Sequence, residues 1–132
     1  LKLGMKHQTA RGVLNFYLHH GVGGGTSNGS RVTRLEKLGV DYVADIVAMG
    51  HVHGLVQSKR ITLGMDNAKQ PNIVEKEKLH LLTGTALRLC NTDSSVTYSE
   101  TAGYQPAVIG HMELDLKFSN RKGFEYRARE VS

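Results

Sequence analysis

Residues 45–54 read Asp-Ile-Val-Ala-Met-Gly-His-Val-His-Gly. The first part is a short apolar run bounded by glycine, which fits a buried strand better than a helix. In an extended backbone, residues i and i+2 project to the same side, so we expect His51 and His53 to face one site together. Gly50 and Gly54 flank the pair and allow a tight turn or the close approach of a ligand. Because neutral imidazole binds zinc, iron, manganese and nickel, the pattern favours a metal site.

A second group of histidines follows an earlier apolar segment. Residues 12–18 are predicted to form a strand, and His19, His20 and Gly21 come directly after it. Two parallel strands that both end in histidine place these side chains at the same edge of one sheet, where open α/β sheets bind ligands. A His-x-His motif alone also occurs at strand ends with a structural role, so the upstream pair is what strengthens the metal-site interpretation.

The segment between these two strands has a helical pattern. Residues 27–38 are predicted to form a helix capped by Asn28 or Ser30, with Gly39 directly after its last turn. An apolar stripe at helical spacing would face the sheet, and a basic stripe would lie on the outer, solvated face. The apolar stripe is Val32, Leu35 and Leu38, and the basic one is Arg31, Arg34 and Lys37. Strand, helix and strand, the last over residues 41–49, predict a βαβ unit with parallel pairing and hence an α/β fold.

The chain beyond Gly54 changes character. Apolar and polar residues alternate over residues 55–56, 60–63, 78–83 and 108–118, a pattern typical of half-buried antiparallel strands. Residues 65–78 contain Pro71 and are predicted to be a loop or hairpin connection, while Gly84 marks a tight passage. Residues 122–132 are either a final edge strand or a tail. Residues 1–11 are polar and basic and predict either the tail of a preceding helix or a disordered lead.

Composition limits the classes of function. The 132 residues are enough for one domain. The net charge of +5 suits anionic ligands such as phosphate esters or nucleic acid, but it is equally usual in ordinary proteins. No arginine-rich run is present, and with five tyrosines, three phenylalanines and no tryptophan a base-stacking platform is not indicated. The single cysteine, Cys90, fits a reducing, cytoplasmic location, and no stretch is long enough to predict a membrane span.

Residues 21–29 form a stretch of glycine, serine, threonine and asparagine with Gly23, Gly24 and Gly25 at its centre. Such a loop can present backbone N–H groups to a phosphate, so these three glycines are candidates for a substrate loop. The alternative is a plain flexible connection. The loop lacks the Gly-Lys-Ser/Thr ending of a P-loop, and the chain contains no dinucleotide fingerprint.

Two stretches of the sequence resemble the second half of the calcineurin-like metallophosphoesterases, especially their phage and bacterial members. They are His-His-Gly-Val-Gly-Gly-Gly at residues 19–25 and Gly-His-Val-His at residues 50–53. Residues 82–85 and 98–106 resemble the same subgroup more weakly, and the resemblance covers most of residues 13–118. It implies a β-sandwich flanked by helices and the hydrolysis of phosphomonoesters or phosphodiesters by two divalent ions of manganese, iron, zinc or nickel.

The resemblance also implies roles for the histidines. His51 would bind one metal ion and His53 the other. Either His19 or His20 would join His51 on its ion, and the neighbour would pack or touch the substrate. His80 and His111 lie on segments of alternating pattern, and for both we expect a structural role.

The acidic motifs of the family's first half are absent from this sequence. Asp-x-His, Gly-Asp-x-x-Asp and Gly-Asn-His do not occur in it. We therefore expect residues 1–132 to be one domain that forms the C-terminal half of a larger metallophosphoesterase domain, with the N-terminal half as its partner and no strong hydrolysis by itself. Strand edges left open by a missing half predict self-association. Two alternatives remain, a non-catalytic binding module and a small protein in which three histidines hold one zinc.

Overall fold

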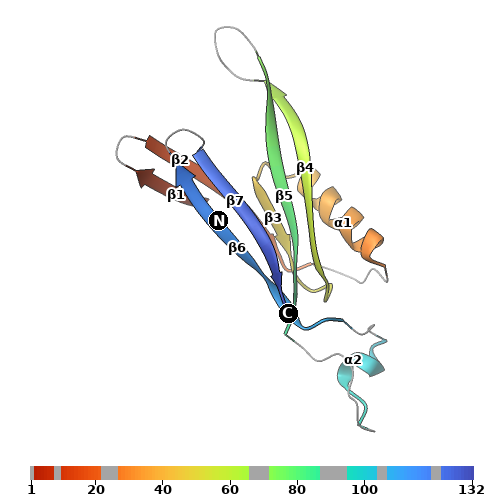
Figure 1. Cartoon of the computed structure of the whole chain (residues 1–132). Coiled ribbons are helices and arrows are strands. Elements are labelled where there is room, and N and C mark those ends of the chain that lie inside the picture. The colour runs from red at the N-terminus through yellow and green to blue at the C-terminus, as the bar shows by residue number, and fades with distance from the viewer. Residues whose placement is uncertain are drawn as a thin grey trace.

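The structure is a computed structural model that describes residues 2–7, 10–21, 27–65, 72–86, 95–103, 107–119 and 123–132. These residues form a seven-stranded sheet in the order β1-β2-β3-β5-β6-β7, with β4 paired to β5 beside this path (Figure 1). The predicted α/β class is confirmed. The elements are β1 Lys2–His7, β2 Ala10–His19, α1 Asn28–Val40, β3 Ile46–Met49, β4 Leu55–Met65, β5 Ile73–Thr85, α2 Tyr98–Thr101, β6 Gly110–Ser119 and β7 Gly123–Val131.

The centre of the sheet is the predicted βαβ unit. β2 and β3 run parallel, in a register from Phe16 opposite Ile46 to His19 opposite Met49, and α1 connects them. β5 runs parallel to β3 on its other side, with Met49 opposite Leu82. The carboxyl ends of β2, β3 and β5 therefore meet at one edge of the sheet. The alternating segments that the sequence predicts to be antiparallel strands lie in β4, which pairs antiparallel with β5, and in β6, which pairs antiparallel with β7.

Strand β3 is buried from both sides, which explains its continuous apolar sequence. All four of its residues are buried, and they alternate between two cores. On one face lies the helix-side core, beneath α1. On the other lies the hairpin-side core, beneath the β6–β7 hairpin, which pairs with β5 at Gly84 and Thr85, at the end of that strand, and folds back over this face (Figure 1). The buried residues of the helix-side core are Leu35, Val47, Met49, Val52 and Leu82, and those of the hairpin-side core are Leu14, Ile46, Ala48, Leu79, Leu81 and Ala128.

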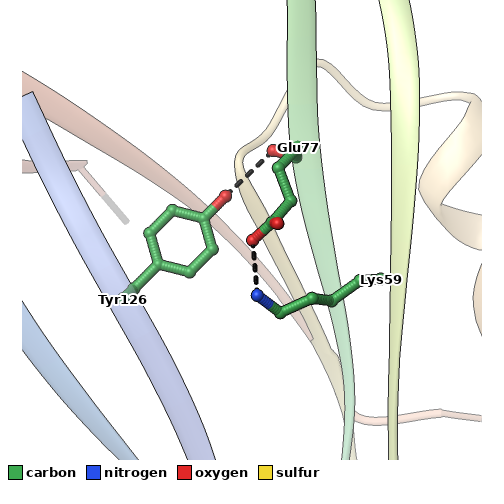
Figure 2. A network of polar contacts seen from close by, with 3 residues as sticks. All are labelled: Lys59, Glu77 and Tyr126. Atoms are coloured by element: carbon green, nitrogen blue, oxygen red, sulfur yellow. Dashed lines mark hydrogen bonds and ion pairs between the residues drawn. The ribbon is translucent and has the colours of Figure 1, made fainter. Parts of the chain in front are cut away.

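A polar cluster fastens the hairpin to the sheet. The Tyr126 hydroxyl on β7 donates to the backbone carbonyl oxygen of Glu77 on β5 at 2.9 Å, and Lys59 Nζ on β4 donates to the Glu77 carboxylate at 2.8 Å (Figure 2). Burial raises the pKa of Tyr126 to about 12, helped by the nearby Glu77 and Asp45 carboxylates. The hydroxyl therefore stays protonated and keeps its role as a donor at neutral pH.

The two ends of the chain differ in part from the predictions. Residues 2–7 are neither a helix tail nor a disordered lead, since they form β1, which pairs antiparallel to β2 from Lys2 opposite Asn15 to His7 opposite Ala10. An edge strand is held by backbone pairing to one neighbour, so it needs no apolar run that a sequence pattern would reveal. At the other end, residues 123–131 form strand β7, which decides between the two alternatives left open there.

The boundaries of α1 also differ from the prediction. Ser27 is the N-cap, and its Oγ accepts a hydrogen bond from the Ser30 N–H at 3.2 Å. Gly39 lies inside the helix rather than after it, because α1 continues to Val40. A Cβ at Gly39 would collide with the ring Nε2 of His80, so a side chain of any size is excluded there by packing. This close contact, and not a turn, accounts for the glycine.

The strands around the predicted connection are longer than expected, and β3 is shorter. β3 begins at Ile46, because residues 41–45 bend and the Asp45 carboxylate accepts the Asn15 N–H at 2.7 Å. β4 extends to Met65 and β5 starts at Ile73, so much of the predicted connection over residues 65–78 is paired strand. Residues 66–71 lie outside the described residues. Neither helix among the described residues is long and apolar enough to cross a membrane.

Candidate functional site

The bend at residues 50–54 lies at the edge where β2, β3 and β5 end. It is held at both ends by backbone hydrogen bonds, from the Gly50 N–H to the His19 carbonyl oxygen and from the Gly84 N–H to the Gly54 carbonyl oxygen, each 3.1 Å long. Between these anchors, Val52 is only 6% exposed and belongs to the helix-side core. The backbone of the bend is therefore held at three points, Gly50, Val52 and Gly54. The two histidines precede and follow Val52 in the chain.

Both histidines of the bend have an unusual backbone conformation. The φ angles are 64° at His51 and 46° at His53, in the left-handed region that L-residues other than glycine rarely adopt. Each such residue costs about 1–2 kcal/mol, and conformations of this kind cluster at functional sites. The extended backbone predicted here is wrong, because the chain turns directly after Met49. The bend, and not the alternation of a strand, sets the directions of the two rings.

The rings of His20, His51 and His53 lie at this edge with the His51 ring near each of the other two, and we call these three side chains the histidine row. The ring centroids of His20 and His51 are 5.1 Å apart, and those of His51 and His53 are 6.4 Å apart. His20 comes directly after β2, whereas the other two come from the bend after β3. The parallel pairing of β2 and β3 thus brings together the histidines that the two sequence motifs contribute.

His19 is placed differently. Its Nδ1 accepts a hydrogen bond from the Gly21 N–H at 2.8 Å, and its ring stacks on Tyr17 with centroids 6.2 Å apart. Tyr17 in turn stacks on Tyr42 at 3.7 Å. The sequence leaves open whether His19 or His20 joins His51, and the geometry places His20 beside it.

Glycines allow the two histidine segments to approach each other. Gly21 has a φ of 93°, and a Cβ there would lie 2.8 Å from the Gly50 carbonyl oxygen and 3.1 Å from the His51 Cβ. A Cβ at Gly50 would lie 3.3 Å from the His20 carbonyl oxygen. Gly21 is therefore required by both conformation and space.

The ring of His53 is oriented by β5. Its Nδ1 shares a hydrogen bond of 2.9 Å with the hydroxyl of Thr85, a residue that is only 6% exposed. Burial lowers the pKa of His53, and the nearby His51 and Arg31 lower it further. The neutral ring that metal binding needs is thus favoured at neutral pH. A partner on one ring nitrogen is also typical of histidines that bind metal through the other.

Arg31 is a candidate that the sequence pattern missed. It lies in the first turn of α1, and its Nη1 would be 3.1 Å from a Cβ at Gly54. Arg31 and His53 line the same surface pocket of about 390 Å³, which Val108 and Glu130 also border. The helical stripe predicts an outer-face position for Arg31, and this is wrong, because the N-terminus of a crossover helix lies at the edge where the preceding parallel strand ends. That rule, applied to the first turn, would have indicated Arg31.

The donors present fit only part of a metal centre. Within the described ranges, no group of three or more histidine, cysteine, aspartate or glutamate side chains is positioned to hold a single metal ion. The histidine row instead consists of a close pair, His20 and His51, and a third ring, His53, farther along. These three side chains fit two incomplete donor sets, whose remaining ligands would have to come from another segment.

The other candidates from the sequence lie elsewhere. His80 is buried on β5 beneath α1, and His111 is exposed on β6, where its Nε2 is 3.6 Å from the Glu113 carboxylate. Gly23, Gly24 and Gly25 of the predicted substrate loop, and Cys90, lie outside the described residues. Comparisons of the chain with protein-family models, with curated proteins and with solved structures found no match.

Proposed function

We propose that this chain supplies the histidine part of a two-metal phosphoesterase site that hydrolyses phosphomonoesters or phosphodiesters. The observation that carries the proposal is the histidine row, in which His20, His51 and His53 come together from the ends of two parallel strands. His20 and His51 would bind one divalent ion and His53 the other. The α/β fold with a hairpin over one face of its sheet is compatible with the β-sandwich of the calcineurin-like metallophosphoesterases.

The residues of this chain would have different roles in such a site. Bound divalent ions, in this proposal manganese, iron, zinc or nickel, would lower the pKa of a water molecule and neutralise charge on the phosphate. Thr85 holds the ring of His53 in a fixed orientation. Arg31, beside His53 in the same pocket, would bind an oxygen of the anionic substrate through its guanidinium. His19, held by Gly21 and Tyr17, is the neighbour that packs.

The acidic ligands would come from another segment, which we propose is the N-terminal half of the same domain. Three neutral imidazoles bring no negative charge to balance two divalent cations. Hard divalent ions such as manganese also prefer oxygen ligands. The chain by itself is therefore expected to bind metal weakly and to hydrolyse phosphate esters poorly. Three histidines on one zinc, the single-metal alternative, would need the ring of His53 to move closer to the other two.

Metal binding by the purified chain tests the assignment. Calorimetric titration with Zn²⁺ and with Mn²⁺ should show weak binding, and H20A or H51A should each reduce the affinity of one site at least about tenfold, equivalent to 1.4 kcal/mol. Because His20 and His51 would share an ion, the double variant should lose little more than either single variant. H53A should act on a different site, and its effect should add to that of H51A. H111A is the matched control and should bind metal as the parent chain does.

Hydrolysis gives a second test. The chain alone should not turn over p-nitrophenyl phosphate or bis-p-nitrophenyl phosphate with either metal. Efficient hydrolysis by the 132-residue chain would contradict the division of the site between two segments. Equal affinities in the parent chain and in H20A, H51A and H53A would contradict a role for the histidine row in binding metal.

A further inference from the structure

The outer halves of β4 and β5 extend beyond the rest of the sheet as a two-stranded arm, which we define as residues 60–65 and 73–78. β3 pairs with β5 only from Leu79 to Leu82, whereas β4 and β5 stay paired from Arg60 opposite Lys78 to Met65 opposite Ile73. Figure 1 shows this arm projecting past the other strands. Two strands alone are marginally stable in water, so an arm of this length gains from a third strand.

One face of the arm carries an exposed apolar row along β4, while on β5 the same face carries Glu75 and Glu77 beside Ile73. Ile61, Leu63 and Met65 alternate along β4 and are 61%, 69% and 69% exposed, and Ile73, opposite Met65, is 74% exposed. Edge strands usually carry lysine, proline or a bulge that blocks pairing with another chain. Residues 61–65 contain no charge and no proline, and the register from Leu55 to Met65 runs without a bulge. The protecting charges, Lys59 and Arg60, come just before this stretch.

The two edges of the arm differ. Among the strands that the structure describes, β4 pairs with β5 alone, so its other edge carries no strand. The edge of β5 is covered in part by the segment before β3, since Lys78 Nζ donates to the Tyr42 carbonyl oxygen at 2.8 Å and the Leu79 N–H donates to the Asp45 carbonyl oxygen at 2.9 Å. The β4 edge is therefore the one that can accept a further strand.

We propose that β4 of a second copy of this chain occupies this edge and forms a symmetric, antiparallel β4–β4 dimer. With Thr62 on the two-fold axis, Ile61 lies opposite Leu63 of the other copy, and Lys59 lies opposite its Met65. Apolar cross-strand pairs of this kind stabilise a sheet, whereas like charges directly opposite destabilise it. Registers centred at Lys59 or Arg60 would put two basic side chains face to face. The charge pattern of β4 thus disfavours these two registers and favours those that pair the apolar end of β4 with itself, of which we propose the one centred on Thr62.

The dimer edge is independent of the histidine row. Thr83, near the carboxyl end of β5, is ten residues from Ile73 along the same strand, about 33 Å at 3.3 Å per residue. An acidic segment that completes the metal site must approach the carboxyl ends of the strands, at the other end of the molecule from the arm. A second copy on the arm leaves that edge open, which favours a second copy over the acidic segment as the occupant of the arm.

Sedimentation equilibrium over a range of protein concentrations, without added metal, tests the proposal. The parent chain should reach the mass of a dimer as concentration rises. L63K and I61E should each raise the dissociation constant of the dimer at least about tenfold, because each buries a charge against an apolar residue. An equimolar mixture of the two variants should recover the dimer, since the lysine introduced in one copy would then face the glutamate introduced in the other.

A matched control and three contrary outcomes complete the test. V13K changes an apolar residue of similar exposure, 60%, on β2 and should leave the dimer unchanged. A parent chain that stays monomeric at every concentration would overturn the proposal, as would dimers that persist in L63K and I61E. Failure of the mixture to recover the dimer would exclude this register. None of these outcomes bears on metal binding, so the two proposals can fail separately.

Discussion

At Gly21 the two histidine segments pack closely against each other. This glycine combines a φ of 93° with a position where a Cβ would meet the Gly50 carbonyl oxygen and the Cβ of His51. The conformation alone disfavours any L-side chain, and the contact with backbone atoms leaves no flexible group that could give way. The positions of His20 and His51 relative to each other therefore depend on this glycine.

We expect G21A to lower the free energy of unfolding by about 2–4 kcal/mol, because the substitution adds a steric clash to an unfavourable backbone conformation. Urea denaturation followed by circular dichroism would measure the change. The matched control is G123A, since Gly123 has a φ of 71° but a Cβ added there would have nothing within 4 Å. G123A should lower the free energy of unfolding by only about 1 kcal/mol. Equal losses in the two variants would mean that the approach of Gly21 to Gly50 is not tight.

At the scale of single residues, the sequence predicts that the histidines of the two motifs lie near one another, but partly for wrong reasons. The motif at residues 50–54 indicates His51 and His53 as neighbours, but an extended strand is predicted where the chain adopts two left-handed residues. Such conformations depend on the backbone hydrogen bonds that hold Gly50 and Gly54 to other strands. A local sequence pattern does not predict these tertiary contacts. The choice between His19 and His20 likewise depends on the tertiary contacts of His19 with Tyr17.

The element that covers the histidine edge from one side is α1, and its C-terminal end is docked by polar contacts. Lys78 Nζ donates to the Gly39 carbonyl oxygen at 2.6 Å and to the Tyr42 carbonyl oxygen at 2.8 Å. The Ser58 hydroxyl donates to the Glu36 carboxylate at 2.8 Å. A cation at the last carbonyl groups also complements the helix dipole. Lys78 thus fixes both the end of the helix and the bend that follows.

We expect K78M to lower the free energy of unfolding by about 1–3 kcal/mol, because it leaves two carbonyl oxygens without their charged donor. K76M is the control, since Lys76 is an exposed residue of the same strand, and its effect should stay within about 0.5 kcal/mol. Hydrogen exchange should show faster opening of the last turns of α1 in K78M alone. Similar exchange in both variants would contradict the role of Lys78 in docking the helix.

His80 lies beneath α1, and we expect its protonation to weaken the docking of the helix. It is 1% exposed, and neither ring nitrogen has a hydrogen-bond partner within the described structure. Burial lowers the pKa of His80, with Lys78 and Arg60 adding to the shift and Glu36 opposing it. The folded pKa thus lies below the unfolded value of about 6.5. The stability that the neutral His80 ring contributes is therefore fully present above about pH 6.5 and is lost as the pH falls through the folded pKa, since the unfolded chain binds the proton first.

H80L should raise the free energy of unfolding at pH 7 by about 1 kcal/mol, because an unsatisfied buried polar ring becomes an apolar side chain. It should also reduce the loss of stability between pH 7 and pH 5. H80Q is the matched control, which cannot titrate but keeps a buried polar group, so it should reduce the pH dependence without the gain in stability. Urea titrations at several pH values would measure both effects. An unchanged pH dependence in both variants would contradict the assignment to His80.

At the scale of elements, the sequence predicts well what depends on local patterns. The apolar stripe of α1 is confirmed, with Leu35 fully buried, and β2, α1 and β3 form the predicted parallel unit. The sequence does not indicate β1, because an edge strand carries no apolar pattern. The prediction that Gly39 follows the helix is wrong, because the contact that requires this glycine is made by His80 on a distant strand. The local sequence thus does not predict helix boundaries and caps where a residue on a distant strand determines them.

We propose a partner for each of two separate surfaces of the molecule. The histidine row lies where the parallel strands end, and the two-stranded arm lies at the opposite end of β4 and β5. The sequence indicates the first through its motifs and the second only as a general expectation of open edges. The layering of the β6–β7 hairpin over the sheet, fastened by Tyr126, is not apparent from alternation alone, since a period of two says which residues are buried but not against which element.

We expect Y126F to lower the free energy of unfolding by about 0.5–1.5 kcal/mol, the usual net contribution of one hydrogen bond. The ring would stay in place, but the Glu77 carbonyl oxygen would lose its donor from β7. Thermal unfolding of Y126F beside Y42F would measure the difference, because Tyr42 is an exposed tyrosine whose ring stacks on Tyr17. A larger loss in Y42F than in Y126F would contradict the part that Tyr126 plays in holding the hairpin.

The most direct measurement of the metal-site proposal is the broadening of histidine side-chain signals by Mn²⁺, followed by two-dimensional NMR of the parent chain. A paramagnetic ion broadens nearby protons steeply with distance, so it reports which rings surround it. We predict that the signals of His20, His51 and His53 broaden first and together, while those of His80 and His111 persist. Broadening that begins at His111, or that reaches all histidines equally, would contradict a metal site at the histidine row.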